Sequence, residues 1–186
     1  MNVYSVKLLQ KVQAHLRKGG VIAYPTESCY GFGCDPFNYA AINKLIKIKG
    51  RSKTKGLIAI SSSTNQLHKL IQPITSDQQY QLAKYWPGFY SLILRVTAKV
   101  PRNLIGSHSK VAVRVSLHRQ VKQLCDSLNT PLVSTSANKS GHHSIRNYRE
   151  CQRQFGGEVL VLPGEIGKAK TPSTIIDWES QRILRQ

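Results

Sequence analysis

The stretch VIAYPTESCYGFGCDP (residues 21–36) divides into an apolar half and a polar half. Its first four residues are apolar and predict a short buried strand. Pro25, Gly31 and Gly33 punctuate the remainder, which we expect to be a segment at the edge of a sheet. The polar side chains available there are Thr26, Glu27, Ser28 and Tyr30. Because ligands of open α/β sheets bind at such edges, this segment is a candidate binding site.

Helical and strand patterns alternate on both sides of this stretch. Apolar residues recur at the helical period over residues 6–16, and Gly19-Gly20 end that helix. Asn38 can cap a second helix, whose apolar residues extend to Ile48. We expect further helices near 64–71, 75–86, 121–128 and 147–155, and strands at 57–60, 91–96, 111–115, 131–135, 158–162, 173–178 and 182–185, with a hairpin over 179–181. The alternation predicts an α/β fold, and the length favours one domain over residues 1–186.

The chain is strongly basic, with 27 Lys and Arg against 9 Asp and Glu and a net charge of +18. Such a charge attracts polyanions, so we expect RNA, a nucleotide or both as partners. Charge alone does not separate these cases. The N-terminal segment has neither the continuous apolar core of a signal peptide nor a membrane span, so we expect no membrane attachment.

The four cysteines indicate a reduced, cytoplasmic compartment. Cys29, Cys34, Cys125 and Cys151 form no CxxC pair, and together with the histidines they lack the paired spacing of a zinc site. Cys125 falls on an apolar helical stripe, where a thiol packs as a small hydrophobic group. We therefore expect no metal ligands among them and no disulfides.

The segment KIKGRSKTKG (residues 47–56) carries a cation at every second position from Lys47 to Lys55, with no acid nearby. We interpret it as a glycine-flanked loop that binds phosphate. It does not match the P-loop pattern, and no GxGxxG sequence follows a predicted strand. Taken alone, such a loop is also typical of a solvated basic turn or a nonspecific RNA-binding patch.

The segment PLVSTSANKSG (residues 131–141) places Ser134, Thr135, Ser136 and Asn138 directly after a predicted strand. Hydroxyl, amide and backbone N–H groups at such a position can bind phosphate and base. The same composition is common in ordinary turns. No GxSxG sequence accompanies the serines, so a Ser-His hydrolase is not favoured.

The order of segments PTESCYGFG, KGRSKTKGLIAI, WPGFYSLIL, VAVRV, PLVSTSANKSG and PSTIID resembles the YrdC family over nearly the whole chain. The chain is similar to the short, single-domain form of that family. The resemblance implies a twisted mixed β-sheet flanked by helices, with a basic concave ligand cavity. Two segments depart from the family pattern: WPGFYS replaces a PGP-type sequence with a Thr, and KGRSK lacks the Pro that follows the Arg.

The resemblance also implies an activity, that of a nucleotidyltransferase. Family members combine L-threonine, bicarbonate and ATP into L-threonylcarbamoyladenylate and pyrophosphate. Partner proteins use this adenylate to modify an adenosine beside the tRNA anticodon, and direct contact with tRNA is consistent with the basic charge. Mg²⁺ would be bound mainly through the ATP phosphates, and no protein nucleophile is needed, so catalysis depends on positioning and charge stabilisation.

The resemblance assigns residues to this reaction. The catalytic candidates are Lys49 and Arg51. The ATP-binding candidates are Lys49, Arg51, Lys55, Ser134, Ser136, Asn138, Ser144 and Arg185, and the threonine-binding candidates are Ser28, Arg114 and Ser173. Arg114 is also notable from the sequence alone, because a cation inside an apolar strand needs an anionic partner. We expect the threonine carboxylate, with pairing to Asp35 or Asp177 as the alternative; Ser173 could also simply begin a strand.

A non-enzymatic factor that binds double-stranded RNA or tRNA, or assists ribosome maturation, is the alternative function. Arg114 together with Ser136 and Asn138 favours a small-molecule site, because RNA backbone binding needs spread charge rather than uncharged groups around one cation. We further expect Arg51→Ala and Asn138→Ala to abolish adenylate formation with little change in thermal stability. This expectation assumes that both residues lie in exposed loops.

Overall fold

The computed structural model describes residues 4–186, so residues 1–3 of the predicted domain lie outside it. Within the described residues, nine strands form one sheet in the order β7-β1-β2-β6-β3-β5-β4-β8-β9. The strands are β1 (Ile22–Pro25), β2 (Tyr30–Gly33), β3 (Ile58–Ser61), β4 (Tyr90–Arg95), β5 (Lys110–Val115), β6 (Leu132–Ser136), β7 (Leu160–Val161), β8 (Thr174–Asp177) and β9 (Ile183–Arg185). The pairs β1-β7, β3-β5 and β4-β8 are parallel and the others antiparallel, so the sheet is mixed.

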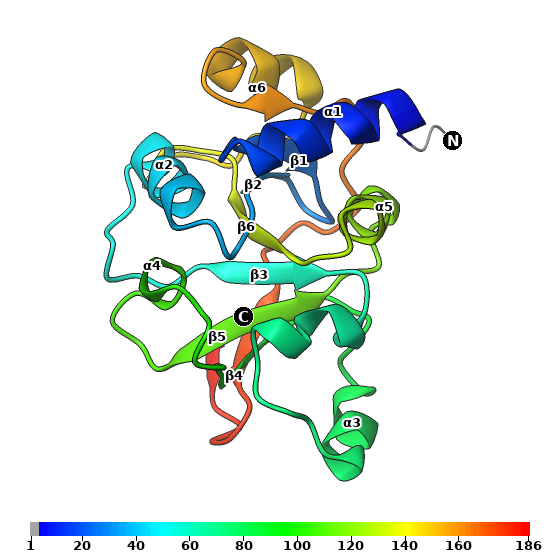
Figure 1. Ribbon diagram of the computed structural model, residues 1–186, viewed down its shortest axis with the longest axis vertical. Helices are drawn as coiled ribbons and strands as arrows, with labels where there is room; N and C mark the ends of the chain where they lie inside the picture. The colour runs from blue at the N-terminus through cyan, green and yellow to red at the C-terminus, as the bar shows by residue number, and fades with distance from the viewer. Residues whose placement is uncertain (1–3) are drawn as a thin grey trace.

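Helices cover both faces of this sheet (Figure 1). They are α1 (Val6–Arg17), α2 (Tyr39–Lys49), α3 (Ser76–Leu82), α4 (Arg102–Ile105), α5 (Arg119–Leu128) and α6 (Tyr148–Phe155), with a 3-10 helix η1 (Thr64–Lys69). The side chains of Ser5 and Asn38 cap α1 and α2 by accepting hydrogen bonds from backbone N–H groups in the first turn of each helix. Each cap lies directly before its helix in the sequence, so the local sequence is sufficient to specify it. The α/β class and the flanked mixed sheet expected from the sequence are thus confirmed.

The strands near the middle of the sheet are buried on both faces. In β1, Ile22 and Tyr24 pack against α1 and α5, whereas Ala23 packs into the larger core on the opposite face, which includes residues of α2, α4 and α6. The same alternation continues in β3 and β6. Burial on two faces explains why these strands are continuous apolar runs rather than alternating ones.

The face that α1 and α5 cover at one end of the sheet opens into a cavity at the other end. Ile58 and Ser134 lie on the same face as Ile60 and Leu132, two residues further along each strand, but they line the cavity instead of the core. Across β5, β4 and β8 the same face continues as the floor of that cavity. One face of the sheet thus carries both the smaller hydrophobic core, under α1 and α5, and the candidate site.

Two sequence interpretations need correction. The polar half of residues 21–36, expected at the edge of a sheet, contains a strand that was not predicted: β2 is fully buried inside the sheet and pairs with β1 and β6. Gly33 allows this packing, since a Cβ there would lie 2.6 Å from the Tyr24 ring and 2.9 Å from the Val133 carbonyl oxygen. The predicted basic loop at residues 47–56 begins later than expected. The helix α2 continues through Lys49, and Gly50, whose φ of 60° is left-handed, ends it.

Other elements differ mainly in extent. The predicted helix at 75–86 ends at Leu82, the segment at 64–71 forms a 3-10 helix, and the predicted strand at 158–162 is reduced to β7. The short helix α4 was not predicted, because four residues give no periodic signal. The predicted C-terminal hairpin is confirmed, since β8 and β9 pair antiparallel around residues 179–181.

Candidate active site

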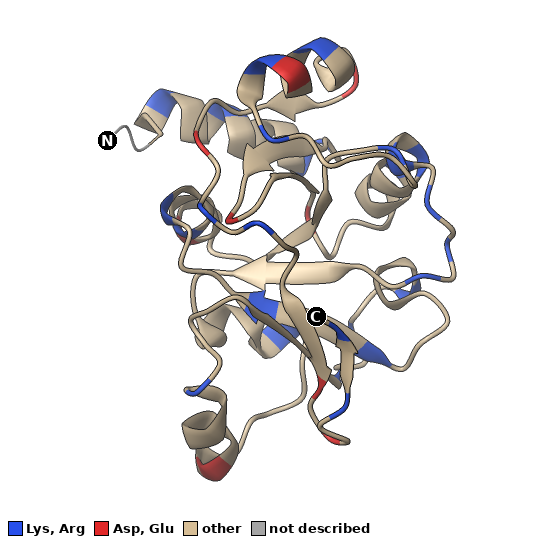
Figure 2. Cartoon of the chain, turned by 180° about the vertical axis from the view of Figure 1, so that it is seen from behind, with Lys and Arg blue, Asp and Glu red and all other residues tan. Residues whose placement is uncertain are grey.

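A basic cavity of about 1450 Å³ lies on the open part of the sheet. Among the described residues, its lining includes nine cations and one carboxylate, Asp177. The cations are Lys49, Arg51, Lys55, Arg102, Lys110, Arg114, Arg146, Lys170 and Arg185. Figure 2 shows how far Lys and Arg outnumber Asp and Glu on the chain. A concave site with this charge favours a ligand that carries several negative charges.

The cavity brings together all eleven residues that the sequence analysis assigned to a site. They come from α2 and the loop after it, from β5, from β6 and the turn after it, from β9, and from the segments just before β2 and β8. They are Ser28, Lys49, Arg51, Lys55, Arg114, Ser134, Ser136, Asn138, Ser144, Ser173 and Arg185. Their ligand-binding roles stay predictions, but their convergence in one cavity links segments that are far apart in the sequence.

Lys49 ties α2 to the turn after β6. Its side chain is 4% exposed, and its ammonium donates to the Ser136 carbonyl at 2.7 Å and to Asn138 Oδ1 at 2.9 Å, with longer contacts at 3.2 Å to Ser136 Oγ and the Asn138 carbonyl. Burial, together with the positive charge of Arg51, lowers the pKa of Lys49 to about 8. The ammonium therefore organises the 136–138 turn as well as adding charge to the cavity.

Asn138 is buried, which contradicts the assumption that it lies in an exposed loop. It is 8% exposed, and its amide group donates to the carbonyls of Lys139 at 2.9 Å and His142 at 2.6 Å, while its oxygen accepts from Lys49. With three hydrogen bonds, this side chain holds the turn together. The expectation that Asn138→Ala leaves stability unchanged is therefore wrong in its premise.

Arg51 and Lys55 follow the end of α2. Arg51 is half-buried and donates from Nη2 to the Gly56 carbonyl at 2.8 Å, so it too is not the exposed side chain that was assumed. Its Nε is buried and has no hydrogen-bond partner within residues 4–186, and burial lowers its pKa. Lys55 is exposed at the cavity rim. The loop therefore combines one anchored cation with one that is free to reach a ligand.

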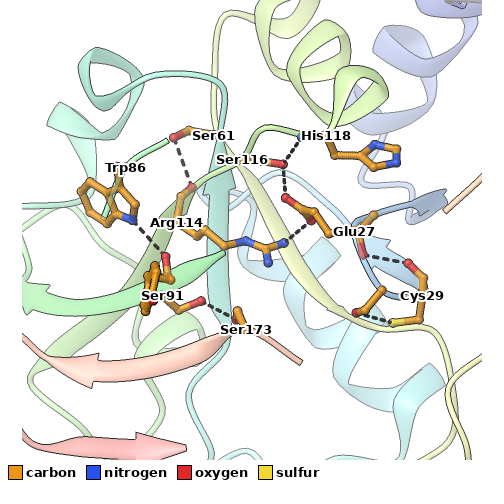
Figure 3. A network of polar contacts seen from close by, with 12 residues as sticks. Glu27, Cys29, Ser61, Trp86, Ser91, Arg114, Ser116, His118 and Ser173 are labelled. Carbon is orange, nitrogen blue, oxygen red and sulfur yellow. Dashed lines mark hydrogen bonds and ion pairs between the residues drawn. The ribbon is translucent and has the colours of Figure 1, made fainter. Parts of the chain in front are cut away.

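Arg114 pairs with Glu27, not with Asp35 or Asp177 as the alternative proposed. Arg114 is 6% exposed, and its Nη2 donates to Glu27 Oε2 at 2.9 Å (Figure 3). Asp177 instead binds Lys110 at 3.0 Å, and Asp35 accepts the Phe37 N–H at 2.8 Å. Glu27 and Arg114 are 87 positions apart, so only the pairing of the strands could identify this ion pair.

Ser173 and Arg185 connect the last two strands at the cavity. Ser173 is buried just before β8, where its hydroxyl lies 2.9 Å from Ser91 Oγ and its carbonyl accepts from Arg185 Nη2 at 2.9 Å. Burial, with the nearby charges of Arg114 and Arg51, lowers the pKa of Arg185. Ser28 also lines the cavity, and its hydroxyl donates to Cys29 Sγ at 3.8 Å. Sequence reasoning missed four further lining cations, Arg102, Lys110, Arg146 and Lys170, because only their charge distinguishes them.

The residues present do not form a cage for a metal ion. Over residues 4–186, no group of three or more His, Cys, Asp or Glu side chains is arranged to hold one. Asp177, the carboxylate in the cavity lining, is already bound by Lys110. Mg²⁺ commonly keeps several waters and is held through substrate phosphates.

Over residues 4–186, no helix is both long and apolar enough to span a bilayer.

Comparison with known proteins defines the class. Residues 14–186 match the model of the Sua5/YciO/YrdC family, described as telomere recombination, and the chain belongs to this family. Within it, the chain is similar to proteins named threonylcarbamoyl-AMP synthase. The one from Chromobacterium violaceum is 49% identical over 179 residues, which cover 96% of this chain and 93% of that protein. The one from Methylobacillus flagellatus is 47% identical over 174 residues, covering 94% and 97%.

Solved structures share the fold. P. abyssi Sua5, solved in complex with L-threonine, is 27% identical with a TM-score of 0.87; the match covers 96% of this chain and 54% of that one. The chain thus spans about half the length of that protein. E. coli YciO has a TM-score of 0.81 at 24% identity, covering 97% of this chain and 89% of that one, which shows the fold alone.

Proposed function

We propose that the chain is a threonylcarbamoyl-AMP synthase. It forms L-threonylcarbamoyladenylate and pyrophosphate from L-threonine, bicarbonate and ATP, for threonylcarbamoyladenosine modification of tRNA next to the anticodon. The observation that carries the proposal is the single cavity in which phosphate-binding cations meet Arg114 and a set of uncharged hydrogen-bonding groups. The names of the curated relatives support the proposal. A surface that only bound RNA would need spread positive charge, but it would not need uncharged hydrogen-bonding groups gathered around one cation.

The reaction is a nucleotidyl transfer in two steps. The threonine amine attacks the carbon of bicarbonate and water leaves, which forms the carbamate. A carbamate oxygen then attacks the α-phosphorus of ATP in line, and pyrophosphate departs with the electron pair of the broken P–O bond. Because the substrates supply both the nucleophile and the leaving group, the protein needs only to align them and stabilise the developing charge.

The cations on and after α2 hold the triphosphate in this proposal. Arg51 and Lys55 bind phosphate oxygens, and Lys49 holds the 136–138 turn against the nucleotide while contributing positive charge. Ser134, Ser136 and Asn138 line the nucleotide, with Ser144 and Arg185 at its periphery. Mg²⁺ would be held mainly through the ATP phosphates and would supply positive charge that offsets the charge of the pyrophosphate; no residue of the cavity is assigned to it.

Threonine occupies the part of the cavity around Arg114. The guanidinium binds the carboxylate, and Ser28 and Ser173 offer hydroxyl groups on two sides. A buried Arg is suited to this role because its planar fork matches a carboxylate. The threonine amine then faces the nucleotide side of the cavity, where the carbamate must form.

The adenylate passes to partner proteins that modify tRNA, and direct tRNA contact through the basic surface is part of the proposal. Cytoplasmic location is proposed because the four cysteines are unpaired, which suits a reducing compartment. ATP and tRNA are also available there.

A direct test is to incubate the purified chain with ATP, Mg²⁺, bicarbonate and L-threonine, and to follow pyrophosphate release together with the adenylate mass. We expect both signals to require threonine and bicarbonate, and Arg114→Gln to reduce them strongly. Absence of turnover in the wild type, alongside tight and salt-sensitive RNA binding, would contradict the proposal in favour of an RNA-binding factor.

A further inference from the structure

The guanidinium of Arg114 is held from two directions. Its Nη2 donates to Glu27 Oε2 at 2.9 Å, and its central carbon lies 5.2 Å from the centre of the Phe89 ring. The second carboxylate oxygen of Glu27 accepts a hydrogen bond from the Ser116 hydroxyl at 2.6 Å (Figure 3). A planar cation with a ring near it and a carboxylate at its edge has a restricted orientation. We call Glu27, Ser116 and Phe89 the Arg114 clamp.

Neighbouring segments hold the backbone of the clamp in place. The Ala169 N–H donates to the Glu27 carbonyl at 3.0 Å, and a Cβ at Gly167 would lie 2.7 Å from that carbonyl oxygen. The Gly88 N–H donates to the Val115 carbonyl at 2.9 Å, which fixes the turn before Phe89 to the strand that carries Arg114. Backbone hydrogen bonds therefore fix the segments that carry the Glu27 carboxylate and the Phe89 ring.

Glu27 occupies only part of the hydrogen-bonding capacity of Arg114. Nε of Arg114 is buried and, over residues 4–186, has no hydrogen-bond partner, and Arg114 lines the cavity. A guanidinium has five N–H donors in one plane, so a carboxylate bound at one edge leaves another edge for a second anion. Building on the proposed function, we infer that Glu27 and Phe89 are positioning residues, which orient the remaining donors of Arg114 toward the carboxylate of L-threonine.

The clamp also directs Arg114 away from the nucleotide. In the described residues, Asp177 is the acidic side chain of the cavity lining, and Lys110 already binds it. Without Glu27, the phosphates of ATP become the strongest anions within the cavity. Loss of the carboxylate should therefore weaken threonine binding selectively, because Arg114 is free to turn toward phosphate.

Steady-state kinetics with each substrate varied in turn test this inference. We expect Glu27→Ala to raise the KM for threonine by about 30-fold, the size of a lost charged hydrogen bond, while the KM for ATP does not rise. Glu27→Gln keeps an acceptor of the same shape and should stay within about fivefold of wild type. Phe89→Leu should raise the threonine KM about threefold through loss of the cation–π contact.

Matched controls separate this effect from a general loss of structure. Glu158→Gln removes an exposed carboxylate outside the cavity lining, and Tyr80→Leu removes an exposed ring on α3; both should leave the two KM values unchanged. Equal rises in both KM values, a loss of kcat alone, or no change in Glu27→Ala would overturn the inference. If Glu27→Ala does not fold, Phe89→Leu carries the same comparison of the threonine KM with the ATP KM, and Glu27→Gln remains the conservative reference.

The two proposals fail differently. A wild-type chain that forms no adenylate contradicts the proposed function. A wild-type chain that forms adenylate, with clamp variants that affect threonine and ATP equally, contradicts the positioning role alone.

Discussion

At the scale of single residues, polar side chains in this cavity bind each other as well as facing the space for a ligand. The Lys49 ammonium contacts Ser136 and Asn138, the two residues that we predicted from the sequence to line the nucleotide. Arg114 is similarly held by Glu27 before any substrate carboxylate is considered. Substitutions here will therefore change the local structure together with ligand binding, and the two effects have to be measured separately.

Asn138→Ala should lower stability and activity together. The variant removes three hydrogen bonds and leaves the carbonyls of Lys139 and His142 without this donor, which should reduce the free energy of unfolding by about 2 kcal/mol. Urea denaturation of the variant beside Ser144→Ala, an exposed residue of the same cavity, provides the measurement. Equal stability of Asn138→Ala and wild type would show that the turn is held by other contacts.

The titration of Lys49 should make kcat/KM for ATP depend on pH. Its pKa of about 8 means that the ammonium is charged below this pH and neutral above it. We therefore expect kcat/KM for ATP to decline as pH rises through about 8, at saturating threonine and bicarbonate. Arg51 and Cys29 are the nearby titratable groups, so the profile of Lys49→Gln is the reference. An identical decline in that variant would assign the titration to another group.

At the scale of elements, the buried strand β2 determines how the candidate site is assembled. It lies between β1 and β6, so it places the segment around Glu27 and Ser28 beside the turn after β6. Its glycines make this possible, because the strand packs closely against Tyr24 and the backbone of β6. The sequence did not predict this strand, since Gly and polar residues are frequent in turns.

Gly33→Ala should destabilise the chain through overpacking. The new Cβ would lie 2.6 Å from the Tyr24 ring and 2.9 Å from the Val133 carbonyl oxygen, and we expect a loss of about 2 kcal/mol in unfolding free energy. Gly157→Ala is a suitable control, because a Cβ there meets nothing within 4 Å. A thermal midpoint of Gly33→Ala equal to that of the control would show that the sheet accommodates the methyl group.

At the scale of the whole molecule, a net charge of +18 acts on every anionic ligand. Exposed cations are screened by salt, whereas the buried pair of Arg114 and Glu27 is screened much less. Small substrates and RNA should therefore respond differently to ionic strength. The response distinguishes a ligand bound inside the cavity from one spread over the surface.

Affinity for tRNA should fall by at least about tenfold between 50 and 200 mM salt, because binding releases counterions from the phosphates. Affinity for threonine should change by less than about twofold over the same range, since one buried cation binds it. Fluorescence anisotropy with labelled tRNA, and calorimetry with threonine, measure the two responses. A tRNA affinity that is insensitive to salt would contradict binding through the basic surface.

The sequence by itself predicted the alternation of helices and strands and the Asn38 cap of α2, and its resemblance to the YrdC family supplied the eleven candidate site residues. Periodicity and capping depend on neighbours along the chain, so they can be predicted locally. The tertiary structure added the Glu27–Arg114 pair, the burial of Asn138, the contacts of Lys49 and the clamp around Arg114. These depend on which strands lie side by side and in which register, and that arrangement results from packing between segments far apart in sequence.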